Sequence, residues 1–598
     1  MPSAVLERYK ALTNTSTRNE VSAVLNSIIL ASPSTLDPTA RRELITQILD
    51  DLKAVGKRRL LAKDAAQALL AVKTLGREPS GSEVIASTDN LKTLLSFQST
   101  FKDTPDAATE ALRCIANSLL LIESGRSLFL EKGVDGGDSC VLMLEKAQAP
   151  DQIFILARIL FLATASGSRY LVTMIEKKYN SSYLVDIIGS KLECLINPVQ
   201  SGATLAREAM TDLLKFTFNI LLYYPNMTEA EPQNADQSSN GSKVLGDFWD
   251  PKLTGLLSPI LRVFLRLQPS SPCPMASPLT HTIHALIGFP IAPALKTIWF
   301  STQPVSPSRT SSSNSPKAPS PKRLGSQSSS RSQSPSRSSP TTSKPSTLDR
   351  ALSVLTAGRS RSRSPSPVVT SSTQVVNKAL DLLDATLTRY FPGKTEADDA
   401  SVREKVKKES TDTLDDLLSP IVVLITKLCV ADETCRTRVR QFIVPDDLDR
   451  SSPLEERSDI LGRCLRLMGS VYHARLKDAI GEMIFAACDN NASILSAFFG
   501  YGNVAGFLFN KGIMTAPPPS EGGPIDIPTT SATGEAINPI TGSTVQPKST
   551  GPDMTDEEKE REMDKLLVLF DRMEKIGALP KDQNPIRKAI HEGKFANS

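Results

Sequence analysis

The feature that most constrains this chain is an apolar spacing of three and four residues that returns in segment after segment. In the stretch EALRCIANSLLLIESG the pattern places four residues on one helix face: Leu112, Ile115, Leu119 and Ile122. The stretch IFILARILFLATASG repeats it with Ile153, Leu156, Leu160 and Ala163. Gly125 and Gly167 end the two stretches about 42 residues apart, which is typical of armadillo and HEAT repeats.

Further copies of the pattern follow along the chain. A looser one has Leu214, Phe218 and Leu221 on one face, and we expect Pro225 to end that helix. Two later faces consist of Leu461, Leu465, Met468 and Tyr472, and of Leu476, Ile480, Met483, Ile484 and Ala487. No strand pattern separates them, and such helices must stack to bury their apolar faces. The sequence therefore predicts an all-α, armadillo/HEAT-like α-solenoid superhelix with a concave and a convex wall.

Three segments are too polar to form a packed core: 229–242, 301–346 and 516–553. We expect all three to be mobile. The predicted organisation is N-terminal repeats over 1–300, a disordered Ser/Arg/Pro-rich insertion over 301–372, C-terminal repeats over 373–515, a flexible linker over 516–553, and a separate C-terminal helix and tail over 554–598.

The insertion carries much of the chain's positive charge. Between Ser301 and Val368 the chain has about 11 Lys or Arg and a single acid, Asp349. Since the formal net charge of the whole chain is +4, the rest of the chain has a net charge of about −6. An acidic body of this kind favours a basic partner surface. Six Ser-Pro steps in the insertion are candidate phosphorylation sites: Ser306, Ser315, Ser320, Ser334, Ser339 and Ser364. An RNA-binding Ser-Arg segment is the alternative, but no interleaved aromatics or RNA-recognition motif accompany it.

The last predicted helix has clear boundaries. Thr555 and Glu558 form a capping box, and Gly577 fits the position just after the helix. Its apolar stripe consists of Met563, Leu566, Leu567, Phe570 and Met573, and is widened by Val568 and Leu569. A helix apolar on more than one side docks against something, either its own solenoid or a partner.

Signatures of catalysis are missing from the sequence. GYGNVAG at 500–506 superficially resembles a dinucleotide-binding loop, but its spacing is wrong and no strand precedes it, so a turn between helices is expected. His281 and His284 are three residues apart without further metal ligands nearby. The eight cysteines form no CxxC pair and are expected to be reduced and buried. We therefore expect no catalytic residues, no metal, no cofactor and no transmembrane segment.

Four stretches resemble the synembryn family: EALRCIANSLL at 110–120, REAMTDLLKFTFNI at 207–220, AFFGYGNVAGFLFNKGIM at 497–514, and INPITG followed by MTDEEKEREMDKLLVLFDRM. They occur in order over nearly the whole chain, and the chain looks like a fungal-type member with a Ser/Arg-rich insertion. The resemblance implies a guanine nucleotide exchange factor and folding chaperone for heterotrimeric G protein alpha (Gα) subunits. Such a protein binds the GDP-bound or nascent subunit, stabilises its nucleotide-free state and releases it on GTP binding.

The resemblance also suggests which residues contact Gα. These are Lys73, Asn117, Arg158, Asn219, Tyr501, Asn503, Leu566 and Phe570. Polar groups on inner helices could bind the backbone and terminal carboxylate of a docked Gα helix. Two alternatives stay open: Asn117 and Asn219 would tie neighbouring repeats together, and Lys73 and Arg158 would simply be solvated.

Two features depart from the family pattern. Animal members carry an acidic, phosphorylated patch where this chain reads APPPSEGGPIDIPTTSATGE, so activation by phosphorylation is not expected there. The Ser-Arg insertion has no counterpart in the family. The rival interpretation of the chain is an armadillo-type adaptor that binds a basic peptide without dependence on nucleotide state. We expect a cytoplasmic monomer, without DNA or RNA partners, that reaches the plasma membrane or cell cortex through Gα.

Overall fold

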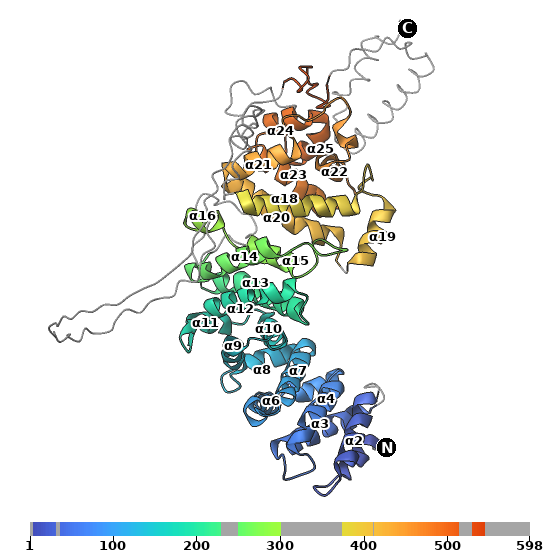
Figure 1. Cartoon of the computed structure of the whole chain (residues 1–598), viewed down its shortest axis with the longest axis vertical. Helices are drawn as coiled ribbons and strands as arrows, with labels where there is room; N and C mark the ends of the chain where they lie inside the picture. The colour runs from blue at the N-terminus through green and yellow to red at the C-terminus, as the bar shows by residue number, and fades with distance from the viewer. Residues whose placement is uncertain are drawn as a thin grey trace, which may run out of the picture.

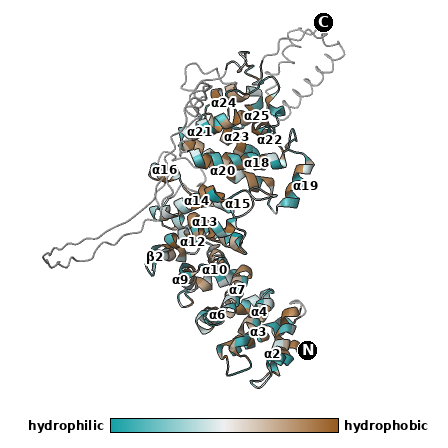
Figure 2. Ribbon diagram, in the orientation of Figure 1, coloured by the Kyte–Doolittle hydropathy of each residue, from teal (hydrophilic) through white to brown (hydrophobic). Residues whose placement is uncertain are grey.

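The computed structural model describes residues 4–31, 36–228, 249–300, 373–410, 412–513 and 529–544. Its helices follow one another in chain order from one end of an elongated stack to the other (Figure 1). Figure 2 shows that apolar and polar residues share the same helices along the whole stack, as helices that pack on one side require.

The first part of the stack runs to residue 300. Its elements are α1 (Ala4–Lys10), α2 (Arg18–Leu30), α3 (Pro38–Lys53), η2 (Ala62–Asp64), α4 (Ala65–Leu75), α5 (Pro79–Ile85), α6 (Thr88–Thr100), α7 (Pro105–Leu121), α8 (Glu123–Leu130), α9 (Gly136–Lys146), α10 (Pro150–Thr164), α11 (Tyr170–Glu176), β1 (Lys178–Tyr179), β2 (Ser182–Tyr183), α12 (Leu184–Gln200), α13 (Ala206–Met227), η3 (Pro251–Leu256), α14 (Leu257–Arg266), α15 (Leu279–Ile287) and α16 (Pro293–Trp299).

The second part begins at residue 373. Its elements are α18 (Gln374–Tyr390), α19 (Ala400–Glu409), α20 (Leu414–Ala431), α21 (Glu433–Ile443), η5 (Leu454–Glu456), α22 (Ile460–Met468), α23 (Ala474–Ala487), α24 (Ala492–Phe499) and α25 (Tyr501–Asn510). Within the described residues the only paired strands are β1 and β2, which form a two-stranded antiparallel hairpin. The prediction of an all-α solenoid is confirmed, and the hairpin is a small exception to helix following helix.

Two rows of helices build the stack. The first wall consists of α2, α4, α7, α10, α13, α15, α20 and α23, each packed on the next. The second wall consists of α3, α6, α9, α12, α14, α18 and α22, packed in the same way. Because each unit contacts its neighbours along the row, the apolar core is continuous from α1 to α25.

The stack continues across the insertion at 301–372. Helix α15 packs on α20, and Lys427 Nζ donates to the carbonyls of Ile287 at 2.6 Å and Phe289 at 3.1 Å. Lys296 Nζ donates to the carbonyl of Ala431 at 2.6 Å. The predicted boundary between the two sets of repeats is therefore not a break in the packing.

The helical spacing predicted most of the buried faces correctly. Helices α7 and α10 cover the first two predicted stretches, and Leu112, Ile115 and Leu119 are buried. The expected stop at Pro225 is wrong, because α13 continues to Met227 with Pro225 inside its last turn. A proline there loses only one hydrogen bond near an end that frays in any case.

Tyr472 does not lie on the helix face that its spacing predicts. Helix α22 ends at Met468, and the Asp398 carboxylate accepts hydrogen bonds from the backbone N–H groups of Val471 at 2.9 Å and Tyr472 at 3.3 Å. Because these N–H groups point to a side chain instead of a helix carbonyl, the chain turns here. Tyr472 is left 63% exposed.

Candidate partner-binding surface

Four of the predicted contact residues lie on four successive helices of the first wall. Lys73 is on α4, Asn117 on α7, Arg158 on α10 and Asn219 on α13. Their shared wall is a consequence of the repeat, since equivalent positions of stacked helices face the same side.

Two of these residues are held by neighbouring repeats. Lys73 Nζ donates to Glu110 Oε2 on α7 at 2.6 Å. Asn219 is buried, and its Nδ2 donates to the carbonyl of Phe161 and to Thr164 Oγ1 on α10, both at 3.0 Å. Half-buried Asn117, by contrast, has no side-chain hydrogen bond to any described residue.

Arg158 has one bonded edge and one accessible side. Its Nε donates to Asp212 Oδ2 on α13 at 2.7 Å, and its guanidinium lies 4.6 Å from the ring centroid of Phe154. Asp212 is only 2% exposed, whereas the Arg158 side chain is 44% exposed. Arg158 is therefore oriented from inside the protein and is not simply solvated.

Arg158 belongs to a larger set of contacts that we call the aromatic–basic strip. Its members come from α10, α13 and α15: Phe154, Arg158, Phe161, Asp212, Lys215, Phe218, His281 and His284. Lys215 Nζ lies 5.5 Å from the Phe161 ring centroid and 3.9 Å from Asp212 Oδ1. The ring centroids of Phe218 and His284 are 6.3 Å apart. The phenylalanine and histidine rings are half-buried, so their faces remain partly accessible.

The two histidines of the strip are held neutral at pH 7. Burial lowers the pKa of His281 to about 4, and the nearby positive charge of Lys215 acts in the same direction. Burial also lowers the pKa of His284. Their rings lie 5.8 Å apart, but no group of three or more metal-ligating side chains exists in the described part of the chain. The strip thus offers aromatic faces and two cations around one buried carboxylate.

Tyr501 and Asn503 lie at the other end of the stack, at the start of α25. Gly500 forms the turn between α24 and α25 at φ +79°. The predicted helix-to-helix turn is therefore confined to Gly500, because residues 501–506 of the motif already belong to α25. The backbone N–H of Tyr501 donates to the carbonyl of Pro539 at 2.9 Å, and that of Gly502 to Ile540 at 2.8 Å. Asn503 Nδ2 donates to the carbonyl of Phe499 at 2.8 Å.

Residues 529–544, which we call the strap, therefore dock on the end of the solenoid. The expectation that 516–553 is mobile throughout is wrong for this part. The reason is backbone pairing, because the strap supplies carbonyls to the first turn of α25, whose N–H groups have no partner within the helix. GYGN and INPITG, two motifs that identify the family resemblance, contact each other here.

Arg450 fastens the strap and was missed in the sequence. It is 4% exposed, and its guanidinium donates to the carbonyls of Gly542 at 2.6 Å and Phe498 at 3.1 Å. Its own carbonyl accepts the N–H of Thr544 at 2.8 Å. Burial lowers the pKa of Arg450. No local pattern marks it, since both partner segments are far away in sequence.

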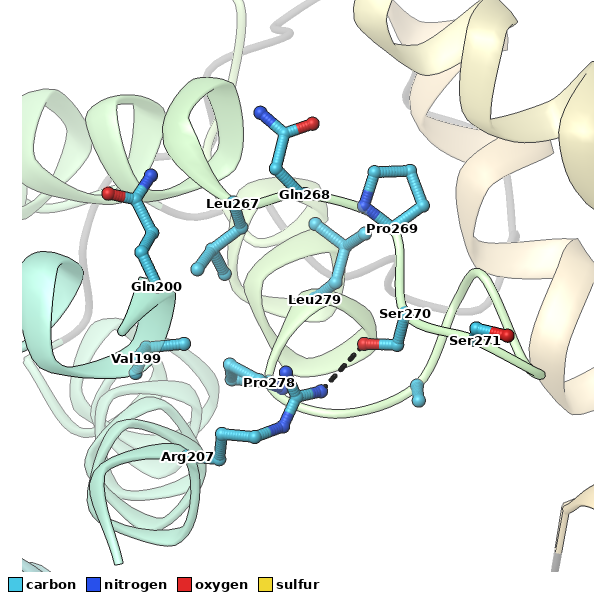
Figure 3. A pocket seen from close by; sticks show the side chains of 11 residues that line it. Val199, Gln200, Arg207, Leu267, Gln268, Pro269, Ser270, Ser271, Pro278 and Leu279 are labelled. Carbon is cyan, nitrogen blue, oxygen red and sulfur yellow. Dashed lines mark hydrogen bonds between the residues drawn. The ribbon is translucent and has the colours of Figure 1, made fainter. Parts of the chain in front are cut away.

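A cleft of about 580 Å³ opens between the end of α12, the start of α13 and the loop before α15. Figure 3 shows Arg207 reaching across it to Ser270, with a distance of 2.8 Å between Nη2 and Oγ. The same nitrogen donates to the carbonyl of Ser277. Arg207 is thus engaged in holding the loop.

Several predicted residues lie outside the described ones. They are Leu566, Phe570, the capping box at Thr555 and Glu558, and the six candidate phosphorylation sites Ser306, Ser315, Ser320, Ser334, Ser339 and Ser364. All eight cysteines are described and unpaired, and every one except Cys194 is buried. Burial raises the pKa of thiols such as Cys114 and Cys464, which keeps them protonated. Across the described ranges, no helix combines the length and apolarity needed to span a membrane.

The two stacked walls and the docked strap define an all-α solenoid of the repeat type. Comparison with known proteins gives the family. The sequence profile described as guanine nucleotide exchange factor synembryn (Ric8) matches residues 68–594, and the chain belongs to this family.

Individual relatives share a shorter region with this chain. The chaperone Ric-8A of Xenopus laevis is 30% identical over 166 residues, which cover 27% of this chain and 30% of that protein. The chaperone Ric-8 of Drosophila pseudoobscura pseudoobscura is 28% identical over 180 residues (29% and 31%). The chaperone ric-8 of Caenorhabditis elegans is 26% identical over 202 residues (30% and 33%). The chain thus spans about a third of the length of the curated relatives it matches.

Proposed function

We propose that the chain is a guanine nucleotide exchange factor and folding chaperone for Gα subunits. The observation that carries the proposal is the family match over residues 68–594. The name chaperone on the relatives agrees with it. The chain then acts by binding and carries out no covalent chemistry itself.

The aromatic–basic strip is the surface we assign to Gα. An amphipathic helix docks on such a surface by placing apolar side chains against half-exposed rings. Arg158 and Lys215 lie over Phe154 and Phe161, so their cations are held in place before a partner arrives. Because Asp212 neutralises only one of the two positive charges, the strip favours a partner with a carboxylate at the docked end.

Asn117 adds a hydrogen-bonding group on the same wall. Its amide is unengaged by any described side chain and is therefore available to a peptide backbone. Lys73 and Asn219 contribute indirectly, since their bonds to Glu110 and Phe161 fix the spacing of the wall helices. Tyr501, Asn503, Leu566 and Phe570 belong to the second contact that we assign to Gα, at the C-terminal end.

Exchange follows from a difference in affinity. If the chain binds nucleotide-free Gα more tightly than GDP-bound Gα by some factor, then binding of the chain must lower the affinity of Gα for GDP by the same factor. GTP favours the closed subunit and releases it. The same preference for an open, nascent subunit protects it from aggregation, which accounts for a chaperone activity. We place this activity in a cytoplasmic monomer that reaches the plasma membrane or cortex only through Gα.

The test is the rate of GDP release from purified Gα with and without the chain. We expect the wild-type chain to raise the rate, and Lys215→Ala to reduce that effect about fivefold through the loss of one charge contact. Lys177→Ala is the matched control, since Lys177 also pairs with an aspartate, Asp138, and lies 5.6 Å from the ring centroid of Tyr179. An equal loss of the accelerated GDP release in both variants would contradict the assignment of the strip to Gα binding.

A further inference from the structure

The solenoid holds the strap by four consecutive carbonyl groups. Each of them accepts a hydrogen bond: Pro539 from the N–H of Tyr501 at 2.9 Å, Ile540 from the N–H of Gly502 at 2.8 Å, Thr541 from Asn503 Nδ2 at 3.3 Å, and Gly542 from Arg450 Nη1 at 2.6 Å. The bonding continues to the last described residue of the strap, because the N–H of Thr544 donates to the carbonyl of Arg450 at 2.8 Å. The chain is therefore fixed to the solenoid up to Thr544.

Two glycines allow the strap to approach the solenoid this closely. Gly500 and Gly542 both have positive φ, at +79° and +70°. A Cβ built on Gly500 would lie 2.5 Å from the backbone N of Gly542, and a Cβ built on Gly542 would lie 2.8 Å from Leu454 Cδ1. Side chains at these positions would hold the two backbones apart, so the two glycines restrict the strap to one place on the solenoid.

The strap adds little to the apolar core. No residue of 529–544 belongs to the core that runs through the stack, and Ile540 is 61% exposed. Its contacts fix the path of the backbone instead of burying side chains. The docked strap therefore acts mainly on the position of the chain that follows it.

The docked strap shortens the connection to the C-terminal segment 554–598. Nine residues, 545–553, connect Thr544 to Met554, so these two residues are at most about 35 Å apart. Without the docked strap the connection would begin after Ile513, which follows α25, and would contain the forty residues 514–553. The strap thus lowers the number of connecting residues more than fourfold.

The length of such a connection sets how much a second contact adds to a first one. When one part of a chain is bound, a second part binds with an effective concentration that falls roughly as the −3/2 power of the connecting length. A connection of nine residues instead of forty therefore raises the effective concentration of the segment about tenfold. The gain requires no new contact with the partner.

We propose that the strap is an anchor that positions the C-terminal segment for its contact with Gα, and that Arg450 and Gly542 are positioning residues. The inference rests on the proposed function, which assigns Leu566 and Phe570 to a second contact with Gα. The aromatic–basic strip binds one part of the subunit, and the C-terminal segment binds another part from a fixed origin at Thr544. Loss of the anchor leaves both contacts possible but lowers the affinity of the whole chain.

The affinity of the full-length chain for nucleotide-free Gα, measured with connections of different length, tests the inference. Nine Gly/Ser residues inserted after Thr550 double the connection, so the affinity of the otherwise wild-type chain should fall about threefold. The same residues added after Ser598 leave the connection unchanged and are the matched control. If the strap only caps the end of the solenoid, the insertion will leave the affinity unchanged, and the inference is wrong.

Releasing the strap should lower the affinity and remove its dependence on length. Gly542→Val acts from the strap side, since its side chain would meet Leu454 and the backbone of Gly500 while the repeats keep their sequence. We expect the affinity to fall about tenfold, and the insertion after Thr550 to change it further by less than about 1.5-fold. Ala532→Val, at an exposed position of the strap, is the matched control and should keep the wild-type affinity.

Arg450→Ala releases the strap from the solenoid side and should behave like Gly542→Val. Amide exchange of 529–544 shows in which variants the strap is released. If the insertion after Thr550 lowers the affinity equally in the wild-type and Gly542→Val chains, the connection does not begin at the strap and the inference is wrong. A wild-type chain that fails to bind nucleotide-free Gα would overturn the proposed function as well, whereas binding that ignores the connection length overturns the inference alone.

Discussion

The strip on α10, α13 and α15 and the strap on α25 hold their residues in opposite ways. In the strip, side chains contact side chains, as with Arg158, Asp212 and Phe154. In the strap, most contacts go to backbone carbonyls, which Arg450 and the N–H groups of α25 bind directly. A side-chain contact can be removed by a single substitution. The contacts of the strap are instead made to its backbone, so they form only when the whole strap follows one path. We therefore expect substitutions in the strap to affect folding first and those in the strip to affect binding first.

The largest effect should follow from removing Arg450. Arg450→Ala leaves the buried carbonyls of Gly542 and Phe498 without their donor, at a cost of about 4 kcal/mol for the strap. Amide exchange or limited proteolysis of 529–544 measures it. Arg475→Ala, whose side chain is 68% exposed and paired with Asp416, is the control and should change little. If 529–544 stays protected in Arg450→Ala, the claim that substitutions in the strap affect folding first would be wrong.

A somewhat smaller effect should follow from Gly500→Ala. Gly500 has φ +79° and ψ 130°, a conformation that side chains disfavour, and a Cβ there would lie 2.5 Å from the backbone N of Gly542. We expect a loss of about 3 kcal/mol in the free energy of unfolding of the strap and α25. Gly506→Ala, inside α25 and in open space, raises no clash and should instead gain up to about 1 kcal/mol, because alanine has the higher helix propensity. Equal losses in the two variants would refute the backbone argument.

The strip should give a pH-dependent stability that the strap lacks. Because the pKa of His281 is about 4 in the folded chain and near 6.5 when unfolded, the unfolded state binds the proton first as pH falls. Stability should therefore be full above pH of about 6.5, fall by about 3 kcal/mol between there and pH of about 4, and change no further on account of His281. Urea unfolding of wild type and His281→Phe measures this, and parallel pH profiles would contradict it.

The smallest effect on stability should come from Asn117→Ala. Since its side chain bonds to no described residue, the free energy of unfolding should change by less than about 0.5 kcal/mol. Affinity for Gα should nevertheless fall about threefold to tenfold, because a hydrogen bond to the partner is lost. Asn219→Ala should lower the free energy of unfolding more than it lowers the affinity for Gα, since Asn219 is buried and bonded to α10. Binding and thermal unfolding of both variants check the pair.

The same contrast explains what the sequence could predict. Helical spacing gave the buried faces of α7, α10 and α23, because burial in a stack depends on period alone. It missed Arg450 and the docked strap, since these contacts join segments between 38 and 94 residues apart through backbone groups that leave no side-chain pattern. The strip was found only in part. Arg158 was predicted, but Phe154, Lys215 and His281 become one surface only when α10, α13 and α15 pack side by side.

The most direct test of the account compares the affinity of the full-length chain for one Gα subunit in three states: nucleotide-free, GDP-bound and bound to a non-hydrolysable GTP analogue. The account predicts that the nucleotide-free form binds at least about tenfold more tightly than the GDP form, and that the GTP-analogue form binds weakest. Equal affinity for all three states would contradict exchange activity and would instead describe an adaptor that ignores the nucleotide.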